Sequence, residues 1–385
     1  MLAARWHAVR DVRLDEVPEP EAGPGEVLVE VSLAGICGTD VAEYVDGPHM
    51  IRSGPVTLGH EFSGRVAALG PGVTGVAVGQ RICADACIRC GTCEWCRRGE
   101  YNICRTGASV GLHRDGAFAH FVALPAYTLV PLPHQVSDAA AALVEPLAVG
   151  LHAVRQGRVA PGDSVAVVGF GMVGCAALLA ARAAGAARVS VVEPRPERAR
   201  LAHELGASEA PPRRVDVVVE CSGQAEAMPA ALEMVARGGR LVLAGIAHTL
   251  ATVDLSRIVF YEREVIGALG YRYDLERVVA LLAAGRLDVS PLLCPPIALP
   301  DIVRDGFERS LNDPGAPLRV FVQPQGMTAD GRRGIRCPGA PDARKRRAPQ
   351  GAQPQLRDRG AEKLTRQTGR MGAEDPPAVR RQAAT

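Results

Sequence analysis

Four closely spaced cysteines are the residues of this chain best suited to chemistry. Cys90, Cys93, Cys96 and Cys104 lie within one short run. Two successive two-residue gaps keep the first three sulfurs within reach of one ion, and a longer gap lets the fourth complete a tetrahedron. Four thiolates leave no open position, so the pattern predicts a structural zinc site. Cys87 continues the same rhythm, so a set of Cys87, Cys90, Cys93 and Cys96 stays open.

A second set of candidate metal ligands is dispersed along the chain and consists of Cys37, His60, Glu61 and Glu145. A thiolate, an imidazole and carboxylates are the ligands from which catalytic zinc sites are built, with one position left for water or substrate. By their spacing alone, residues of these types are more often structural. They are therefore candidates that a further observation has to support.

A glycine-rich turn follows a predicted buried strand at 164–168 and opens a predicted helix at 172–184. In a dinucleotide-binding turn the first glycine permits the tight bend, the second lets the pyrophosphate approach the backbone, and the third allows close helix packing. The helix N-terminus then faces the anion. The predicted cofactor-binding residues of this turn are Gly169, Gly171, Met172, Val173 and Gly174.

Glu193 ends the next predicted strand, 24 residues after Gly169. A carboxylate there accepts hydrogen bonds from both ribose hydroxyls and repels a 2′-phosphate, so we predict NAD as the cofactor. Arg195 and Arg198 stand close in sequence and would suit a 2′-phosphate, which keeps NADP open as the alternative.

Length and charge set the remaining limits. At 385 residues the chain exceeds the size that one core usually serves, so we expect two domains. The net charge of +2 is uneven, because residues 324–385 hold 14 Lys and Arg against 6 Asp and Glu. The remaining body is mildly acidic, which is not typical of a nucleic-acid-binding domain.

The chain shows neither a signal peptide nor an apolar stretch of about 20 residues, so we expect a soluble cytoplasmic protein without a membrane partner. In that compartment its 11 cysteines are better read as metal ligands and buried thiols than as disulfides.

Hydrophobic patterning predicts an α/β plus β fold. Residues 1–150 show short apolar alternations broken by Gly and Pro, which predicts a β-rich domain. Strands and helices alternate over 151–289, which predicts a doubly wound parallel sheet. Residues 290–323 regain strand-like segments and are expected to return to the first domain. Residues 324–385 lack an apolar pattern and are expected to be a disordered tail.

The segment Gly59-His60-Glu61 continues with Gly64, Gly70 and Val73 at fixed spacing. This pattern resembles the zinc signature of the medium-chain alcohol dehydrogenase superfamily, and the resemblance extends over residues 1–323. Within the superfamily the chain is most similar to the branch of butanediol and sorbitol dehydrogenases, with threonine dehydrogenases close to it.

The resemblance implies a GroES-like catalytic domain beside a Rossmann domain. It implies that Cys37 and His60 bind a catalytic zinc, with Glu61 and Glu145 sharing the remaining positions. Asp40 would orient His60.

By the same resemblance, Thr39 would start a proton relay, although Ala42 stands where the family often carries a histidine. Arg198 would pack on the adenine. The chain would form a homodimer or homotetramer. The family also normally fits a strand and a helix where this chain has only residues 206–214, so we expect its parallel sheet to lack one edge element.

These features together predict a zinc- and NAD-dependent oxidoreductase that interconverts a secondary alcohol and its ketone by hydride transfer. The expected substrate is a vicinal diol such as 2,3-butanediol, and sorbitol, threonine or an aminocyclitol are the alternatives. A zinc-ribbon protein that binds nucleic acid through the basic tail is the non-enzyme alternative, which the acidic body disfavours.

Overall fold

The structure, a computed structural model, describes residues 1–208 and 214–325. The elements of its β-rich domain are β1 (Leu2–Ala8), β2 (Asp11–Glu16), β3 (Glu26–Gly35), α1 (Gly38–Asp46), β4 (Val56–Thr57), β5 (Glu61–Leu69), β6 (Arg81–Ala84), β7 (Cys87–Ile88), α2 (Glu94–Arg97), β8 (Ala108–Ser109), β9 (Phe121–Pro125), β10 (Leu129–Pro131), α3 (Asp138–Ala141), β16 (Ile297–Ala298), a π-helical segment (Ile302–Glu308), α10 (Arg309–Asn312) and β17 (Phe321–Gln323). The elements of its α/β domain are α4 (Val144–Gln156), β11 (Ser164–Val168), α5 (Met172–Ala183), β12 (Arg188–Val192), α6 (Pro196–Glu204), β13 (Val215–Glu220), α7 (Met228–Met234), β14 (Val235–Leu243), α8 (Ser256–Val259), β15 (Glu264–Gly267) and α9 (Leu275–Ala283).

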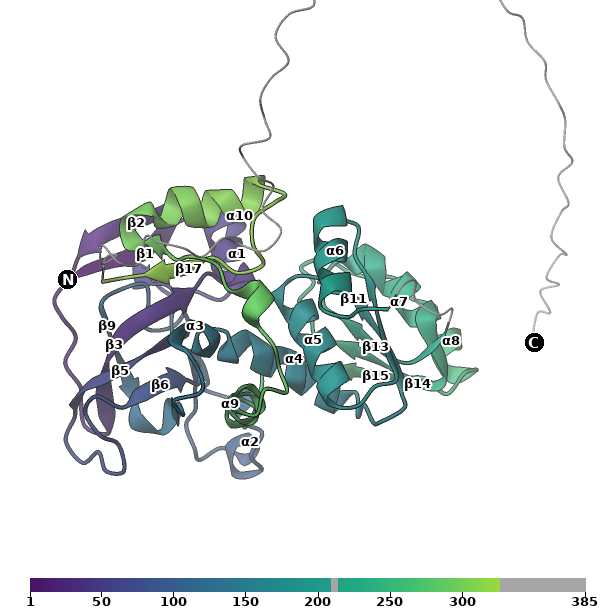
Figure 1. Cartoon of the computed structure of the whole chain (residues 1–385), viewed down its shortest axis with the longest axis horizontal. Coiled ribbons are helices and arrows are strands. Elements are labelled where there is room, and N and C mark those ends of the chain that lie inside the picture. Colours follow the sequence, from purple (N-terminus) through teal and green to yellow (C-terminus); the bar gives the residue numbers. More distant parts are fainter. Residues whose placement is uncertain (209–213, 326–385) are drawn as a thin grey trace, which may run out of the picture. The chain divides into compact units, whose positions relative to one another are not determined.

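The main sheet of the β-rich domain has the strand order β10-β6-β5-β3-β17-β16, with β9 also paired to β3. Strand β3 alternates buried and half-buried residues because one of its faces packs on the core. Strand β17, from the far end of the described chain, inserts beside β3 (Figure 1). Its Val322 and the preceding Val320 join the same core as Val29 and Val31. These two residues of the return segment therefore pack with the β-rich domain.

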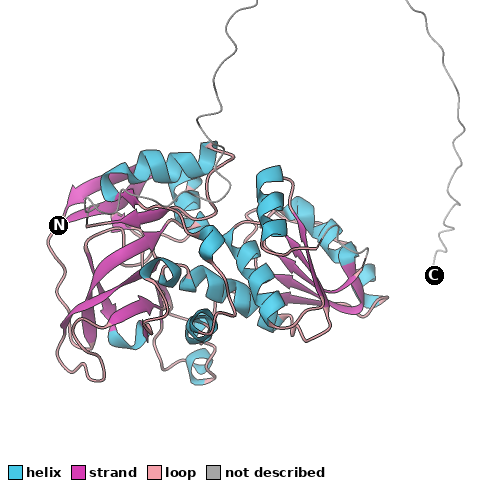
Figure 2. Cartoon of the chain, viewed as in Figure 1, coloured by secondary structure: helices cyan, strands magenta, loops and turns pink. Residues whose placement is uncertain are grey.

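The α/β domain contains a parallel sheet in the order β12-β11-β13-β14-β15. Along β11, Val165 and Val167 pack into the core that includes α5, whereas Ala166 and Val168 pack into the core that includes α7. A strand buried on both faces explains the continuous apolar run at 164–168. Figure 2 shows helices on both sides of these strands. The predicted doubly wound sheet is confirmed.

The edge of this sheet beside β12 is shortened. The usual order for such a domain includes a further strand outside the second one. Among the described residues, β12 is the outermost strand, and only a single bridge from Ser190 to Ser208 continues the sheet beyond it. An edge element was expected to be missing in the segment 206–214, and residues 209–213 of that segment lie outside the described residues.

Residues 324–385 were predicted to be disordered. Of these, only 324 and 325 are among the described residues, and the rest of this prediction lies outside them. Within the described ranges, no helix is both long enough and apolar enough to cross a bilayer.

Candidate metal and cofactor sites

The dispersed candidate ligands Cys37, His60 and Glu61 meet because two neighbouring strands bring them to one end of the main sheet. Strand β3 ends at Gly35, which pairs with Glu61 at the start of antiparallel β5. Cys37 follows β3 directly as the N-cap residue of α1. One ligand atom from each of the three side chains lies within 4.8 Å of the other two.

Sequence reasoning missed Arg319, which closes this cluster from the return segment. Phe321 in β17 pairs with Gly35, so Arg319 enters at the same end of the sheet. Its guanidinium is 4% exposed and donates a hydrogen bond to Glu61 Oε1 at 2.8 Å and another to the Ile36 carbonyl. The only local signal for Arg319 in the sequence was a basic residue directly before a short apolar segment, and such a signal is weak.

Asp40 and Thr39 lie in the first turn of α1, next to Cys37. Asp40 is fully buried, and its Oδ2 accepts a hydrogen bond from the Cys37 backbone N–H at 2.8 Å. Its Oδ1 lies 3.6 Å from His60 Nδ1, which is an ion-pair distance but longer than a hydrogen bond. Thr39 Oγ1 lies 3.7 Å from Cys37 Sγ. Both residues therefore border the cluster where the resemblance placed them.

Burial and mutual charge shift the titration of the cluster. Although burial opposes it, the neighbouring His60 lowers the pKa of Cys37 to about 7. Burial also disfavours the imidazolium, but Asp40 and Cys37 hold the pKa of His60 well above its usual value. Burial raises the pKa of Glu61 well above its usual value, against the effect of Arg319.

Glu145 approaches the cluster from the first turn of α4 but is not one of the three residues that converge within 4.8 Å. Burial, and then the Glu61 carboxylate, raise its pKa to about 8. Tyr271 forms a hydrogen bond with Glu145 that lowers this pKa. Glu145 is thus a close neighbour of both Glu61 and Tyr271.

Unpartnered buried atoms show that the cluster suits a cation. Glu61 Oε2, His60 Nδ1 and Asp40 Oδ1 are buried and have no hydrogen-bond partner among the described residues. An unpaired buried carboxylate oxygen is costly unless a positive charge satisfies it. Cysteine, histidine and glutamate together are donors that zinc accepts. The residues present therefore fit a metal ion.

The four cysteines of the 90–104 lobe, namely Cys90, Cys93, Cys96 and Cys104, also converge, with all their sulfurs within 4.8 Å of one another. Three of the sulfur pairs lie 3.5, 3.9 and 4.0 Å apart. A zinc ion bound tetrahedrally by sulfur at about 2.3 Å requires separations of roughly 3.8 Å. The lobe therefore matches a closed zinc site.

Backbone geometry in the lobe favours thiolates. The N–H groups of Thr92 and Cys93 donate to Cys90 Sγ, and they lower the pKa of Cys90 to about 5. Cys87 lies in β7 and is not among the converging sulfurs, so the geometry does not favour the alternative set that included it.

The glycine-rich turn joins β11 to α5. Gly169 has φ of +85°, in the region that favours glycine. A Cβ on Gly174 would come 2.0 Å from the Gly169 carbonyl oxygen, whereas a Cβ on Gly171 would meet no atom within 4 Å. The turn is therefore closed where the helix packs and open where a pyrophosphate would approach. Met172 and Val173 begin α5, whose first backbone N–H groups face this opening.

Glu193 follows β12 and faces the same turn. Its carboxylate accepts hydrogen bonds from the Phe170 N–H at 2.7 Å and from the Arg195 N–H at 3.0 Å. A carboxylate has about four acceptor positions, so two remain for a ligand. Arg198 lies half-buried on α6, and burial and Arg195 lower its pKa while Glu193 opposes them.

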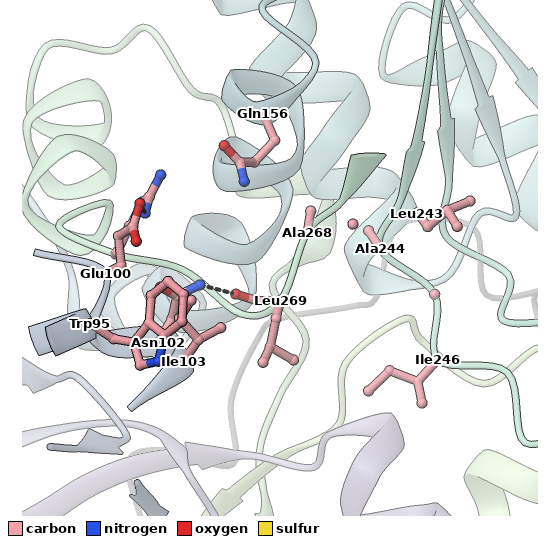
Figure 3. A pocket seen from close by; sticks show the side chains of 13 residues that line it. Trp95, Glu100, Asn102, Ile103, Gln156, Leu243, Ala244, Ile246, Ala268 and Leu269 are labelled. Carbon is pink, nitrogen blue, oxygen red and sulfur yellow. Dashed lines mark hydrogen bonds and ion pairs between the residues drawn. The ribbon is translucent and has the colours of Figure 1, made fainter. Parts of the chain in front are cut away.

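A cavity of about 610 Å³ lies between the four-cysteine lobe and the carboxyl ends of β14 and β15 (Figure 3). Asn102 from the lobe donates a hydrogen bond to the Leu269 carbonyl at 2.8 Å at its wall. Trp95 and Gln156 also line it. None of the candidate ligands Cys37, His60, Glu61 and Glu145 does, so this cavity is separate from the metal cluster.

Two family models match the chain. The alcohol dehydrogenase GroES-like domain matches residues 23–134, and the zinc-binding dehydrogenase domain matches residues 173–284.

Similar proteins extend this match over most of the chain. The (R,R)-butanediol dehydrogenase of Bacillus subtilis is 33% identical over 350 residues, which cover 84% of this chain and 100% of that protein. The sorbitol dehydrogenase of Bacillus subtilis is 31% identical over 344 residues, which cover 84% and 97%. A crystal structure of a zinc-binding dehydrogenase from Sinorhizobium meliloti 1021 bound to NADP has a TM-score of 0.78 and 32% identity, and the match covers 84% of this chain and 99% of that one.

Proposed function

This chain belongs to the zinc-dependent, NAD(P)-using family of medium-chain alcohol and polyol dehydrogenases, and on that premise we propose that it interconverts a vicinal diol such as 2,3-butanediol and the corresponding hydroxyketone with NAD. The observation that carries the proposal is the convergence of Cys37, His60 and Glu61 at one end of the main sheet. The full-length similarity to a butanediol dehydrogenase supports the choice of substrate.

We assign the catalytic zinc to Cys37, His60 and Glu61. The two oxygens of Glu61 have different partners in this proposal. Oε1 accepts a hydrogen bond from Arg319, and the unpartnered Oε2 is free to bind a cation. Glu145, which lies beside Glu61 but outside the converging set, is the candidate to take its place during the reaction. When bound, zinc supplies a Lewis acid that favours ionisation of a substrate hydroxyl, and NAD supplies the hydride acceptor.

The protein groups around the cluster position it and handle the proton. Asp40 braces Cys37 through its backbone N–H and sets the orientation of His60 by charge. Thr39 Oγ1, 3.7 Å from the Cys37 sulfur, is the hydroxyl that we assign to receive a proton from a bound alcohol. Ala42 offers no side chain that could carry that proton further.

NAD rather than NADP is proposed because Glu193 stands at the end of β12 with acceptor positions left for ribose hydroxyls. Two backbone N–H groups hold its carboxylate in place, so a 2′-phosphate would meet a fixed negative charge. The Sinorhizobium relative is bound to NADP, so this fold also accepts the phosphorylated cofactor.

Replacing Glu193 by alanine should shift cofactor preference toward NADP. Loss of the carboxylate removes its repulsion of the phosphate and leaves Arg195 and Arg198 to attract it, so we expect the ratio of kcat/KM for NADP over NAD to rise about 100-fold. Steady-state kinetics with each cofactor measure this ratio. Glu197→Ala, which removes an exposed carboxylate from the same helix region, is the control. An unchanged ratio in Glu193→Ala would reject the assigned role.

A structural zinc is proposed for the four-cysteine lobe. Cys104→Ser should remove that metal and leave the catalytic one, because three thiolates bind zinc far more weakly than four. We expect metal analysis to show one zinc fewer per chain and the melting temperature to fall by about 5 °C or more. Cys87→Ser should keep the full metal content. The reverse result would restore the ligand set that includes Cys87.

We propose that two copies pair through β15. This strand is outermost in the sheet order and leaves its edge unpaired among the described residues. Val265 on β15 and the nearby Val259, Phe260 and Leu269 are exposed apolar side chains. A Val265→Asp variant should therefore elute as a monomer while the wild type elutes as a dimer or tetramer, as measured by light scattering after size exclusion. A monomeric wild type would contradict the proposal.

A reducing, cytoplasmic location is also proposed, because the four thiols of the lobe must stay reduced to bind zinc.

The test of the proposed reaction is NADH formation from the separate stereoisomers of 2,3-butanediol, with and without a chelator strong enough to strip the catalytic metal. We expect turnover of one chiral isomer and its loss after chelation. Turnover that survives complete metal removal would reject the zinc assignment. No turnover in protein shown to bind NAD and zinc would reject the butanediol assignment, and sorbitol, L-threonine and an aminocyclitol would then be assayed in the same way.

A further inference from the structure

An arginine cluster surrounds one tyrosine of the α/β domain, away from the metal and cofactor sites. The guanidinium carbons of Arg214, Arg237, Arg257 and Arg263 lie 5.3, 4.9, 5.8 and 4.7 Å from the centre of the Tyr261 ring. We refer to these four residues as the arginine cluster. Four like charges around one ring repel one another, so their gathering calls for a compensating charge.

The cluster lies at the amino end of the parallel sheet. Arg214 precedes β13, Arg237 is the third residue of β14, and Arg263 precedes β15. The glycine-rich turn and Glu193 lie at the carboxyl end of the same sheet, where cofactors bind in this kind of fold. The arginine cluster is therefore a separate place on the domain.

The neighbouring carboxylates balance only part of this charge. Glu233 Oε1 and Asp254 Oδ2 lie 3.5 and 3.6 Å from Arg257 Nε, and Arg257 also donates a hydrogen bond to the Tyr261 hydroxyl. In the described ranges of the chain, the side chains of Arg214 and Arg237 have no acceptor within hydrogen-bond or ion-pair distance. Three of the four guanidinium groups therefore have donors to spare.

Arg263 is the most unusual member. It is 4% exposed, and its Nε, Nη1 and Nη2 atoms are all buried with no hydrogen-bond partner among the residues described. Burial lowers its pKa, Glu233 opposes that shift, and Arg214 adds to it. The face of Tyr261 offers a cation–π contact but no acceptor. A buried charge without an acceptor is unfavourable unless a ligand supplies one.

We propose that the arginine cluster is a binding site for a phosphate group, either inorganic phosphate or a phosphate monoester. Planar guanidinium groups bind tetrahedral oxyanions through paired N–H donors. Four arginines against two carboxylates leave an excess charge that a dianion balances. Arg214 and Arg237 are exposed and form the entrance, and the anion reaches Arg263 beneath them when those flexible side chains move aside.

Binding is measured by titration calorimetry with inorganic phosphate, and separately with glycerol 3-phosphate, at constant ionic strength. Saturating NAD is present so that the glycine-rich turn is already occupied. We expect saturable binding, weakened about ten-fold by Arg237→Gln and by Arg214→Gln. Arg188→Gln is the matched control, because Arg188 is an exposed arginine at the same end of the sheet, on β12. Binding of glycerol 3-phosphate ten-fold tighter than inorganic phosphate would identify the ligand as a monoester, and equal binding would identify it as the free anion.

A second variant separates a binding site from a structural role. Arg263→Met keeps the volume and removes the buried charge, so the ligand-free protein should melt at a higher temperature and lose its response to phosphate. If Arg263→Met instead melts at a lower temperature and phosphate does not bind the wild type, the proposal is overturned.

Two further outcomes would also overturn the proposal. Equal stabilisation of all variants by sulfate, phosphate and chloride at matched ionic strength would show general screening. Glu209 lies outside the described residues, and Glu209→Gln tests it: if this variant gains phosphate binding that the wild type lacks, the partner of the cluster is a carboxylate of the chain itself. These readouts are binding and melting, so they stand independently of the proposed dehydrogenase reaction.

Discussion

Replacing Cys37 by alanine should lower kcat/KM for the alcohol by on the order of 1,000-fold or more. The half-buried thiol is one of three ligands that converge within 4.8 Å, and its loss leaves His60 and Glu61 without a third converging ligand among the residues that the structure describes. Metal analysis should show that the catalytic zinc is lost, whereas the four-cysteine lobe, which shares no residue with this cluster, keeps its own. Steady-state kinetics and mass spectrometry of the intact protein measure both effects.

Cys83→Ala is the matched control for this experiment. Cys83 is a buried thiol of the same domain, in β6, and belongs to neither cysteine cluster. We expect its kcat/KM to stay within about two-fold of the wild type and its stability to fall by about 1 kcal/mol. Full activity in Cys37→Ala, or loss of the metal of the lobe, would contradict the assigned ligand set.

Replacing Arg319 by methionine should destabilise the protein by about 3 kcal/mol in the metal-free state. Arg319 and Glu61 are 4% and 0% exposed, and their ion pair is buried at the end of the sheet. Methionine fills a similar volume but removes the guanidinium that donates a hydrogen bond to Glu61 Oε1, so only His60 is left to oppose the charge of that carboxylate. Urea unfolding after metal removal measures the loss.

A double-mutant cycle isolates the ion pair in Arg319→Met. Adding Glu61→Gln removes the stranded charge, so the double variant should recover about 2 kcal/mol of the loss. Arg309→Met, which breaks an exposed ion pair with Asp313 at 3.3 Å, should cost less than about 1 kcal/mol. If the effects of Arg319→Met and Glu61→Gln simply add, the two side chains are not coupled and the assigned contact is wrong.

Local spacing made part of this molecule predictable from sequence. The four-cysteine lobe and the glycine-rich turn are built within short segments, so their residue types and intervals already contain the geometry. The strand at 164–168 was predicted to its ends, because burial on both faces leaves a continuous apolar run.

Contacts between distant segments were not predictable in this way. Arg319 and Glu61 are separated by 258 positions, and no periodicity connects them. Strand β14 begins at Val235, although Arg237, Gly238 and Gly239 interrupt its apolar pattern, and its pairing with β13 contains a register shift. Tertiary pairing, rather than local preference, decided both features.

The insertion of β17 between β3 and β16 has a consequence for how the protein is made. A ribosome synthesises the β3 and β5 segments early, but the strand that pairs with β3 on its other side is translated only after the whole α/β domain. The α/β domain can close on its own residues first, as domains generally do during synthesis. Until residues 319–323 emerge, Glu61 has no Arg319 to neutralise it, so the nascent chain carries an unfinished metal cluster through most of its translation.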